Sequence, residues 1–104
     1  MGIMDLFKKK KANHSIYSGG TGDGMDNAIV INESNSMAGI RAEYVYLEKQ
    51  FGQTKTDWTV ECQSMRSEGG RSFDILTVKL KDGSSRIVWF DITSFLRQEL
   101  VTGI

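Results

Sequence analysis

The chain of 104 residues has no proline, one cysteine, one histidine and no net charge, because 13 basic side chains balance 13 acidic ones. One cysteine excludes an intramolecular disulfide framework and a zinc site built from several thiolates. Balanced charge removes the attraction that draws basic proteins to nucleic acids. No apolar run approaches the roughly 20 residues of a membrane-spanning helix, and no secretory signal is recognisable. We therefore expect a cytoplasmic protein in which the unpaired Cys62 stays reduced.

The same scarcity limits catalysis. A serine or cysteine nucleophile needs a base, and His14 is the only histidine of the chain. His14 lies in a segment without hydrophobic periodicity, whereas Cys62 lies in an extended run on the same face as Trp58 and Val60. That pattern predicts a buried, unreactive thiol far from His14. The sequence therefore favours a protein without catalytic residues.

The N-terminal quarter differs from the rest of the chain. Residues 1–26 contain the Lys8–Lys11 run and a stretch at 19–24 with glycine at four of six positions, which is costly to order. We expect a flexible segment over 1–26 and a single domain over 27–104. The apolar start and the lysines that follow leave peripheral membrane contact through residues 1–11 as an alternative role.

The glycine-rich stretch also raises the question of a ligand. Asp23, Asp26 and Asn27 offer oxygen ligands for calcium, but the spacing and closing Glu of an EF-hand are missing. A phosphate-binding loop follows a strand and opens a helix, and this stretch does neither. We interpret it as a connecting loop and expect no metal or cofactor.

One helix is predicted over about 36–51. Apolar side chains recur at spacings of three and four, which places them on one helical stripe, and Gly52 is a suitable residue to follow the last turn. Ser34, Asn35 and Ser36 are candidate N-caps. The predicted core stripe consists of Met37, Ile40, Tyr44, Leu47 and Phe51.

Extended runs surround this helix, one before it at 28–31 and three after it at 58–64, 73–80 and 86–92. Asp82-Gly83 predicts a type I′ hairpin turn, and a short helix is expected after Thr93. The order β-α-β-β-β indicates an α+β fold with one helix on a curved, antiparallel, four-stranded sheet. This order resembles cystatin-like and NTF2-like architectures, although the Gln-x-Val-x-Gly motif of cystatin inhibitors is absent.

The predicted sheet has more apolar surface than one helix covers. One face carries Leu76, Val78 and Leu80 on one strand and Val88, Phe90 and Ile92 on the next, and we expect it to face the helix. The opposite face carries Phe73, Ile75, Ile87 and Trp89. Apolar patches of this kind often mark interfaces. We expect a non-catalytic module that binds a protein partner or a second copy here, unless the segment around Ile16 and Tyr17 or the terminal helix covers the patch.

Two other functions remain open. A pocket between helix and sheet, using Tyr44, Tyr46 and Asp91, would make the protein a small-molecule binder or an enzyme. Asp74 and Asp91 lie on neighbouring predicted strands, and a carboxylate among apolar groups can act as an acid or base. Specific nucleic-acid binding is not expected, because the order of elements suits a double-stranded RNA-binding domain but the basic terminal helix is missing.

Three stretches are similar to segments of small uncharacterised bacterial proteins. They are Asn27-Ala-Ile-Val-Ile-Asn32, Ala42-Glu-Tyr-Val-Tyr-Leu-Glu-Lys-Gln-Phe-Gly52 and Phe90-Asp-Ile-Thr-Ser-Phe95. This resemblance implies no activity and no functional residues.

Overall fold

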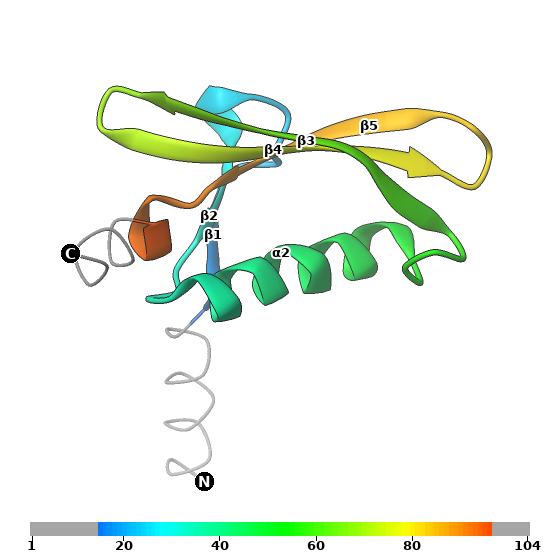
Figure 1. Ribbon diagram of the computed structural model, residues 1–104, viewed down its shortest axis with the longest axis horizontal. Helices are drawn as coiled ribbons and strands as arrows, with labels where there is room; N and C mark the ends of the chain where they lie inside the picture. Colours follow the sequence, from blue (N-terminus) through cyan, green and yellow to red (C-terminus); the bar gives the residue numbers. More distant parts are fainter. Residues whose placement is uncertain (1–14, 97–104) are drawn as a thin grey trace, which may run out of the picture.

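The computed structural model describes residues 15–96. The predictions for Lys8–Lys11, for membrane contact through residues 1–11 and for the chain after Leu96 lie outside this range. Within it, the protein is an α+β fold with one long helix on one face of a five-stranded mixed sheet, as Figure 1 shows. The α+β prediction is therefore confirmed. A helical turn at 93–96, expected after Thr93, lies on the same side of the sheet as the long helix (Figure 1).

The elements follow one another in a simple order. They are β1 (Tyr17–Gly19), the 3₁₀ turn η1 (Met25–Asn27), β2 (Ile29–Ile31), α2 (Ser36–Phe51), β3 (Trp58–Glu68), β4 (Arg71–Leu80) and β5 (Ser85–Asp91). The strand order in the sheet is β1-β2-β5-β4-β3. All neighbours are antiparallel except β2 and β5, which are parallel.

Two features of the predicted sheet are wrong. The sheet has five strands rather than four, because the chain turns back through the glycine-rich stretch so that β1 pairs with β2. Gly19 makes this return possible: its φ is 89°, and a Cβ there would clash with the Ala28 carbonyl oxygen. The sheet is also not fully antiparallel, because α2 carries the chain across to β3 at the far edge and β2 pairs in parallel with β5, the last strand. The β1 strand lies within the segment that the sequence analysis separated from the domain.

The ends of α2 are those that the sequence predicts. The Asn35 side chain accepts a hydrogen bond from the Ala38 N–H at 2.9 Å and so caps the first turn. The helix ends at Phe51, and Gly52 follows with a φ of 107° while its N–H donates to the Glu48 carbonyl at 3.0 Å. Both ends therefore depend on local interactions that short sequence patterns specify.

The buried face of α2 matches the predicted stripe only at its C-terminal end, where Leu47 is buried and Phe51 packs against the core. Met37 is 82% exposed, Ile40 48% and Tyr44 36%, so these three residues were wrongly assigned to the core. The helix instead buries a row with small side chains at its N-terminal end, Gly39, Ala42, Glu43 and Leu47. Gly39 lies against the Phe95 ring so closely that a Cβ would clash with it. Close approach at glycine and alanine therefore fixes the rotation of the helix.

The prediction that Cys62 is buried is also wrong. The pairing of β3 with β4 shifts between Val60 and Cys62, which is a β-bulge, so one extra residue enters β3. Before the bulge, Trp58 and Val60 face the helix opposite Leu80 and Val78; after it, Cys62 pairs with Thr77 on the other face. Cys62 is consequently exposed. Alternation along a strand does not reveal such an insertion.

The core lies between α2 and the sheet. The prediction for the helix-facing strands is confirmed, because Leu76, Val78, Val88, Phe90 and Ile92 are all buried there and Leu80 packs against them. Trp58 and Leu47 complete the centre of this core. Tyr17 also packs on this side, and its hydroxyl donates to the Ala42 carbonyl at 2.7 Å. Neither Tyr17 nor the turn carrying Phe95 therefore covers the opposite face.

Asp82-Gly83 does form the turn between β4 and β5, but the turn is not type I′. Gly83 has a φ of 91°, whereas Asp82 keeps a negative φ. The Asp82 side chain instead accepts from the Ser84 N–H at 2.9 Å. A hydrogen bond to the Asp82 side chain, rather than a positive φ at Asp82, therefore stabilises this turn.

Candidate functional site

The face of the sheet that points away from α2, called the outer face from here on, brings the predicted interface residues together. Ile75 pairs with Trp89 across β4 and β5, and Thr77 with Ile87, so these side chains share one surface. Their exposure is uneven. Ile87 is 56% exposed, Ile75 and Trp89 are half-buried, and Phe73 is fully buried. The outer face is therefore a continuous but partly covered apolar surface.

Phe73 is buried by its own neighbours on the outer face. The Arg71 guanidinium lies 4.8 Å from the centre of the Phe73 ring, a cation–π distance. The Trp89 ring meets Phe73 edge-on, with 5.7 Å between ring centres and 72° between ring planes. Phe73 therefore packs against the Trp89 ring and lies under the Arg71 guanidinium.

Asp91 holds the Arg71 side chain in this position. Its Oδ2 accepts from Arg71 Nε at 2.9 Å, and its Oδ1 accepts from the Thr93 N–H at 3.0 Å and from the Thr93 hydroxyl. Burial of Asp91 tends to raise the pKa of its carboxyl, but the hydrogen bonds from Thr93 and Arg71 outweigh burial and hold that pKa below its usual range. Asp91 is therefore an ionised structural partner, and it is poorly suited to donate a proton.

Removing the charge of Asp91 gives a first prediction. Asp91→Asn should lower the free energy of unfolding by about 1–3 kcal/mol at about pH 7, because one of the two accepting oxygens becomes an NH2 donor and the negative charge beside Arg71 is lost. Since the folded-state pKa is lowered, the wild type keeps this stability above the unfolded pKa and loses it as the pH falls through the folded value. Urea unfolding at about pH 7 and about pH 3 should show the two proteins converging in acid; an unchanged difference would contradict this role.

The three residues of the alternative pocket do not converge. Tyr46 lies on the helix-facing side, between the rings of Tyr17 at 5.5 Å and Phe90 at 5.8 Å. Tyr44 lies beside Trp58, with 6.0 Å between ring centres. Asp91 points to the outer face, since it pairs with Phe73 in the sheet. The sheet thus separates the two tyrosines from the carboxylate.

A pair of buried carboxyl groups is the feature that the sequence analysis missed. Glu43 of α2 is 1% exposed and hydrogen-bonds to Asp74 of β4, which is 3% exposed. Gln63 Nε2 of β3 donates to both carboxylate oxygens of Asp74, at 2.9 and 3.1 Å. The sequence suggests that Asp74 and Asp91 lie close together on neighbouring strands. In the sheet, however, Asp74 pairs with Phe90, and Asp91 pairs with Phe73. The two aspartates therefore point to opposite faces.

The charge state of this pair follows from its surroundings. Burial, the hydrogen bond to Asp74 and the nearby Asp74 charge together raise the pKa of Glu43 to about 10, with burial as the largest cause. Glu43 is thus a neutral carboxylic acid at neutral pH, and its Oε2 has no hydrogen-bond partner among the described residues. The burial of Glu43 could have been predicted from its neighbours on the helix. Gly39, Ala42 and Leu47 share its face, and the small side chains of Gly39 and Ala42 let that face lie close to the sheet.

Three surface hollows lie elsewhere, and neither Glu43 nor Asp74 lines any of them. A volume of about 240 Å³ lies beside Tyr17 and Arg41, and one of about 160 Å³ lies beside Tyr46 and Arg86. The enclosed Glu43–Asp74 pair therefore has no route to a substrate through these hollows.

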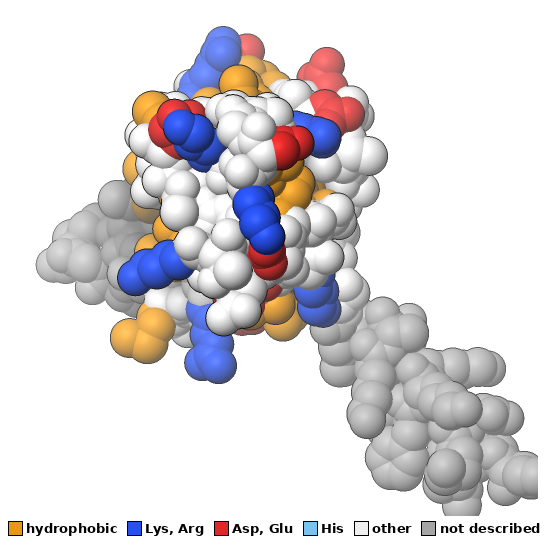
Figure 2. All heavy atoms as spheres, turned by 90° about the vertical axis from the view of Figure 1, so that its right-hand side faces the viewer, with side chains coloured by type: hydrophobic (Ala, Val, Ile, Leu, Met, Phe, Trp, Pro, Cys, Tyr) orange, Lys and Arg blue, Asp and Glu red, His pale blue; other side chains and the backbone are white. Residues whose placement is uncertain are grey.

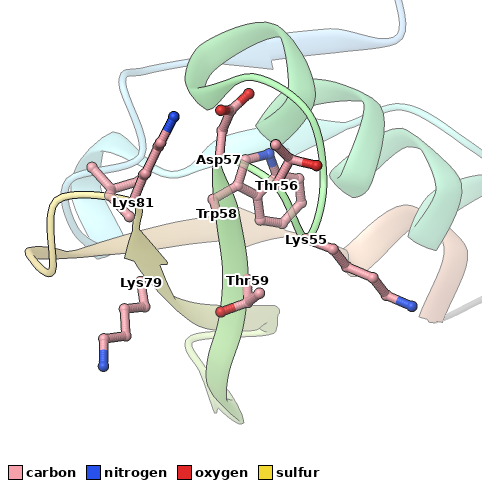
Figure 3. Close-up of a pocket in the computed structure, with 8 residues that line it drawn as sticks. Lys55, Thr56, Asp57, Trp58, Thr59, Lys79 and Lys81 are labelled. Carbon is pink, nitrogen blue, oxygen red and sulfur yellow. The ribbon is translucent and has the colours of Figure 1, made fainter.

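The third hollow, of about 170 Å³, lies where the loop after α2 meets β3 and β4. Lys55, Lys79 and Lys81 line it, but Figure 3 shows their side chains pointing in three different directions. The end of the molecule seen in Figure 2 carries acidic groups among the basic ones. An anion would also meet the C-terminus of α2 here, which has negative character. The hollow is therefore a poor anion site.

Metal ligands do not gather in residues 15–96. No group of three or more His, Cys, Asp or Glu side chains there could hold an ion. The loop that contains Asp23, Asp26 and Asn27 is held by hydrogen bonds between its own backbone groups. The Gly22 N–H donates to the Asn27 carbonyl at 2.6 Å, and the Asn27 N–H donates to the Gly24 carbonyl at 3.1 Å.

Across residues 15–96, the structure contains no helix with the length and apolar character needed to cross a bilayer.

Comparison with known proteins assigns no family and no function to these residues. No protein-family model matches the chain, and neither a curated protein nor a solved structure is significantly similar to it.

Proposed function

We propose that this protein is a non-catalytic protein-binding module whose docking surface is the outer face of the sheet. The observation that carries the proposal is the fixed position of Trp89, a half-buried ring that packs edge-on against the buried ring of Phe73. Trp and Arg are the residues that most often dominate binding energy at protein interfaces. A ring that is already held in place loses little conformational entropy when a partner binds.

The contacts divide the four predicted residues into two roles. Trp89, Ile75 and Ile87 present apolar surface to a partner, and Ile87 is the most exposed of them. Phe73 is the support beneath them, with Arg71 as a polar neighbour that is 43% exposed. The partner we expect is a protein with a complementary apolar patch, and no cofactor is part of the proposal.

The other expectations from the sequence accompany this proposal. A cytoplasmic location, a similarity to small bacterial proteins and a cystatin-like arrangement of helix and sheet are all consistent with a small binding module. The rival function, a ligand pocket or enzyme using Tyr44, Tyr46 and Asp91, is less well supported, because Asp91 is separated from the two tyrosines by the sheet.

A matched pair of isoleucines provides the test. Ile87 and Ile40 have similar exposure, 56% and 48%, but lie on opposite sides of the molecule. A photo-crosslinking amino acid at position 87 should yield a defined adduct with another protein in cells, and the same group at position 40 should not. Adducts of equal yield at both positions would contradict the proposal.

The quantitative prediction concerns Trp89. With the crosslinked partner purified, Trp89→Ala and Ile87→Glu should each weaken binding by about 30-fold or more in calorimetry, as expected for a central hot spot. Ile40→Glu should leave the affinity unchanged. Circular dichroism should show that all three variants remain folded. Loss of folding in Trp89→Ala together with normal affinity of Ile87→Glu would mean that Trp89 acts only in the fold.

A further inference from the structure

The strand β3 leaves one edge of the sheet open. It is the last strand in the order β1-β2-β5-β4-β3, and the structure records one contact to its outer edge among residues 15–96, an isolated bridge between Thr54 and Trp58 at its first residue. It has 11 residues, and every residue from Glu61 to Glu68 is exposed. The opposite edge strand, β1, has only three residues. Half of the backbone N–H and C=O groups of β3 therefore point away from the sheet, ready to pair with another strand.

This edge has little of the protection that usually prevents pairing. Natural edge strands are often blocked by proline, by lysine or by a bulge. β3 contains neither proline nor lysine, and its bulge lies between Val60 and Cys62, near its start. Residues 62–68 after the bulge pair regularly with β4. The free edge of residues 62–68 therefore offers seven regularly spaced residues with which another strand could pair.

We propose that β3 is a self-association surface, on which a second copy of this chain pairs its own β3 in antiparallel orientation about a two-fold axis near Ser64. Such an isologous contact uses the same residues on both copies. It would join the two five-stranded sheets into one sheet through on the order of six backbone hydrogen bonds. Because the axis is perpendicular to the sheet, both outer faces end on one side and both α2 helices on the other.

The side chains of β3 suit a second copy as the occupant. With Ser64 facing itself, Arg66 of one copy lies opposite Cys62 of the other and beside its Glu61, so opposite charges meet. No like charges stand directly opposite each other in this register. Met65, which is 58% exposed, lies opposite Gln63 of the other copy and diagonal to its Met65. Charge and apolar surface therefore both match across the axis.

This inference does not depend on the proposed function, because the contact is made by the backbone edge of β3, whereas Trp89 and Ile87 lie on β5, two strands away. It nevertheless has a consequence for that function. A dimer would place two copies of the Trp89 surface on the same side of one continuous sheet, and a partner with two docking sites would then bind with avidity.

The experiment uses the symmetry of the contact. Ser64 is exposed and pairs with Ile75 on the face away from α2, so a charged side chain fits without disturbing the core. Wild-type protein at about 500 µM should sediment with twice the 11.7 kDa mass of one chain, since even a Kd of ~100 µM gives mostly dimer there. Ser64→Lys alone and Ser64→Glu alone should sediment as monomers, because like charges then oppose each other across the axis.

Mixing these two variants in equal amounts should restore the dimer, since lysine then faces glutamate. The matched controls are Thr56→Lys and Thr56→Glu, exposed positions in the loop after α2, which should behave as the wild type alone and in mixture. Trp89→Ala should also remain dimeric, which separates this surface from the proposed docking face. A monomeric wild type, or dimers that persist in both Ser64 variants, would overturn the proposal.

Discussion

Glu43→Gln should stabilise the protein, and the gain should increase as the pH rises. In the folded state the pKa of Glu43 is raised to about 10 from the ordinary value of 4.5, because the carboxyl is buried and hydrogen-bonded to Asp74. Between these two values the unfolded chain releases the proton and the folded chain keeps it, so the wild type loses stability with rising pH. Glutamine has nearly the same shape and an N–H donor for Asp74, but no charge to gain.

The size of this effect follows from linkage. One unit of pKa difference corresponds to about 1.4 kcal/mol, so the wild type should lose up to about 4 kcal/mol relative to Glu43→Gln between about pH 5 and about pH 8. Below the unfolded pKa the two proteins should have similar stability, since Glu43 is then protonated in both states. Urea unfolding across this range measures the difference.

The control for this prediction is Glu48→Gln, an exposed glutamate on the same helix, whose side chain accepts a hydrogen bond from the Thr54 hydroxyl at 2.8 Å. Glutamine keeps that acceptor, so the pH dependence of Glu48→Gln should follow that of the wild type. Carboxyl carbon NMR should show Glu43 still protonated when the exposed glutamates have ionised. A stability difference that stayed constant across this pH range would mean that Glu43 has the same pKa in the folded and unfolded protein, and would contradict the prediction.

The parts of the fold that the sequence predicted are those controlled by neighbouring residues. Asn35 and Gly52 act on backbone groups within a few positions, so the bounds of α2 were predictable from them. The rows on β4 and β5 that face the helix were predictable as well, because both strands alternate without interruption and join through a short turn.

The parts that were missed depend on residues far apart in the chain. β1 is a three-residue strand that is ordered by pairing with β2, and β2 lies beside β5 only because of the connection through α2. The bulge in β3 moved Cys62 to the opposite face from the one that alternation predicted. Its position depends on the pairing with β4, which the sequence of β3 alone does not specify.

The candidate site shows the same division. The sequence placed Phe73, Ile75, Ile87 and Trp89 on one face, and the cross-strand register brings them together. It did not predict that Arg71 would lie over Phe73, two residues further along β4. The pairing of Asp91 with Arg71 joins β5 to β4 and depends on the cross-strand register. It also treated large apolar side chains as the buried face of α2, whereas glycine and alanine allow the closest approach.

The contact between Gly39 and Phe95 should be strong enough to reverse the effect of a common stabilising substitution. Alanine in place of glycine inside a helix ordinarily gains about 1 kcal/mol. At position 39 the added Cβ would clash with the Phe95 ring, and overpacking of a core costs about 1–3 kcal/mol. Gly39→Ala should therefore lower the free energy of unfolding by up to about 2 kcal/mol in the otherwise unchanged protein.

The same substitution should become stabilising once the ring is removed. In a Phe95→Ala background the clash is absent, so Gly39→Ala should gain up to about 1 kcal/mol from helix propensity alone. Urea unfolding of the four proteins of this double-mutant cycle, with equal osmolyte added to keep the weakest variant folded, gives the coupling free energy directly. A sign reversal would show that Gly39 is present because Phe95 occupies the space of a side chain. Stabilisation by Gly39→Ala in both backgrounds would instead mean that the helix is not held against Phe95, and that the rotation of α2 which exposes Met37 and Ile40 has another cause.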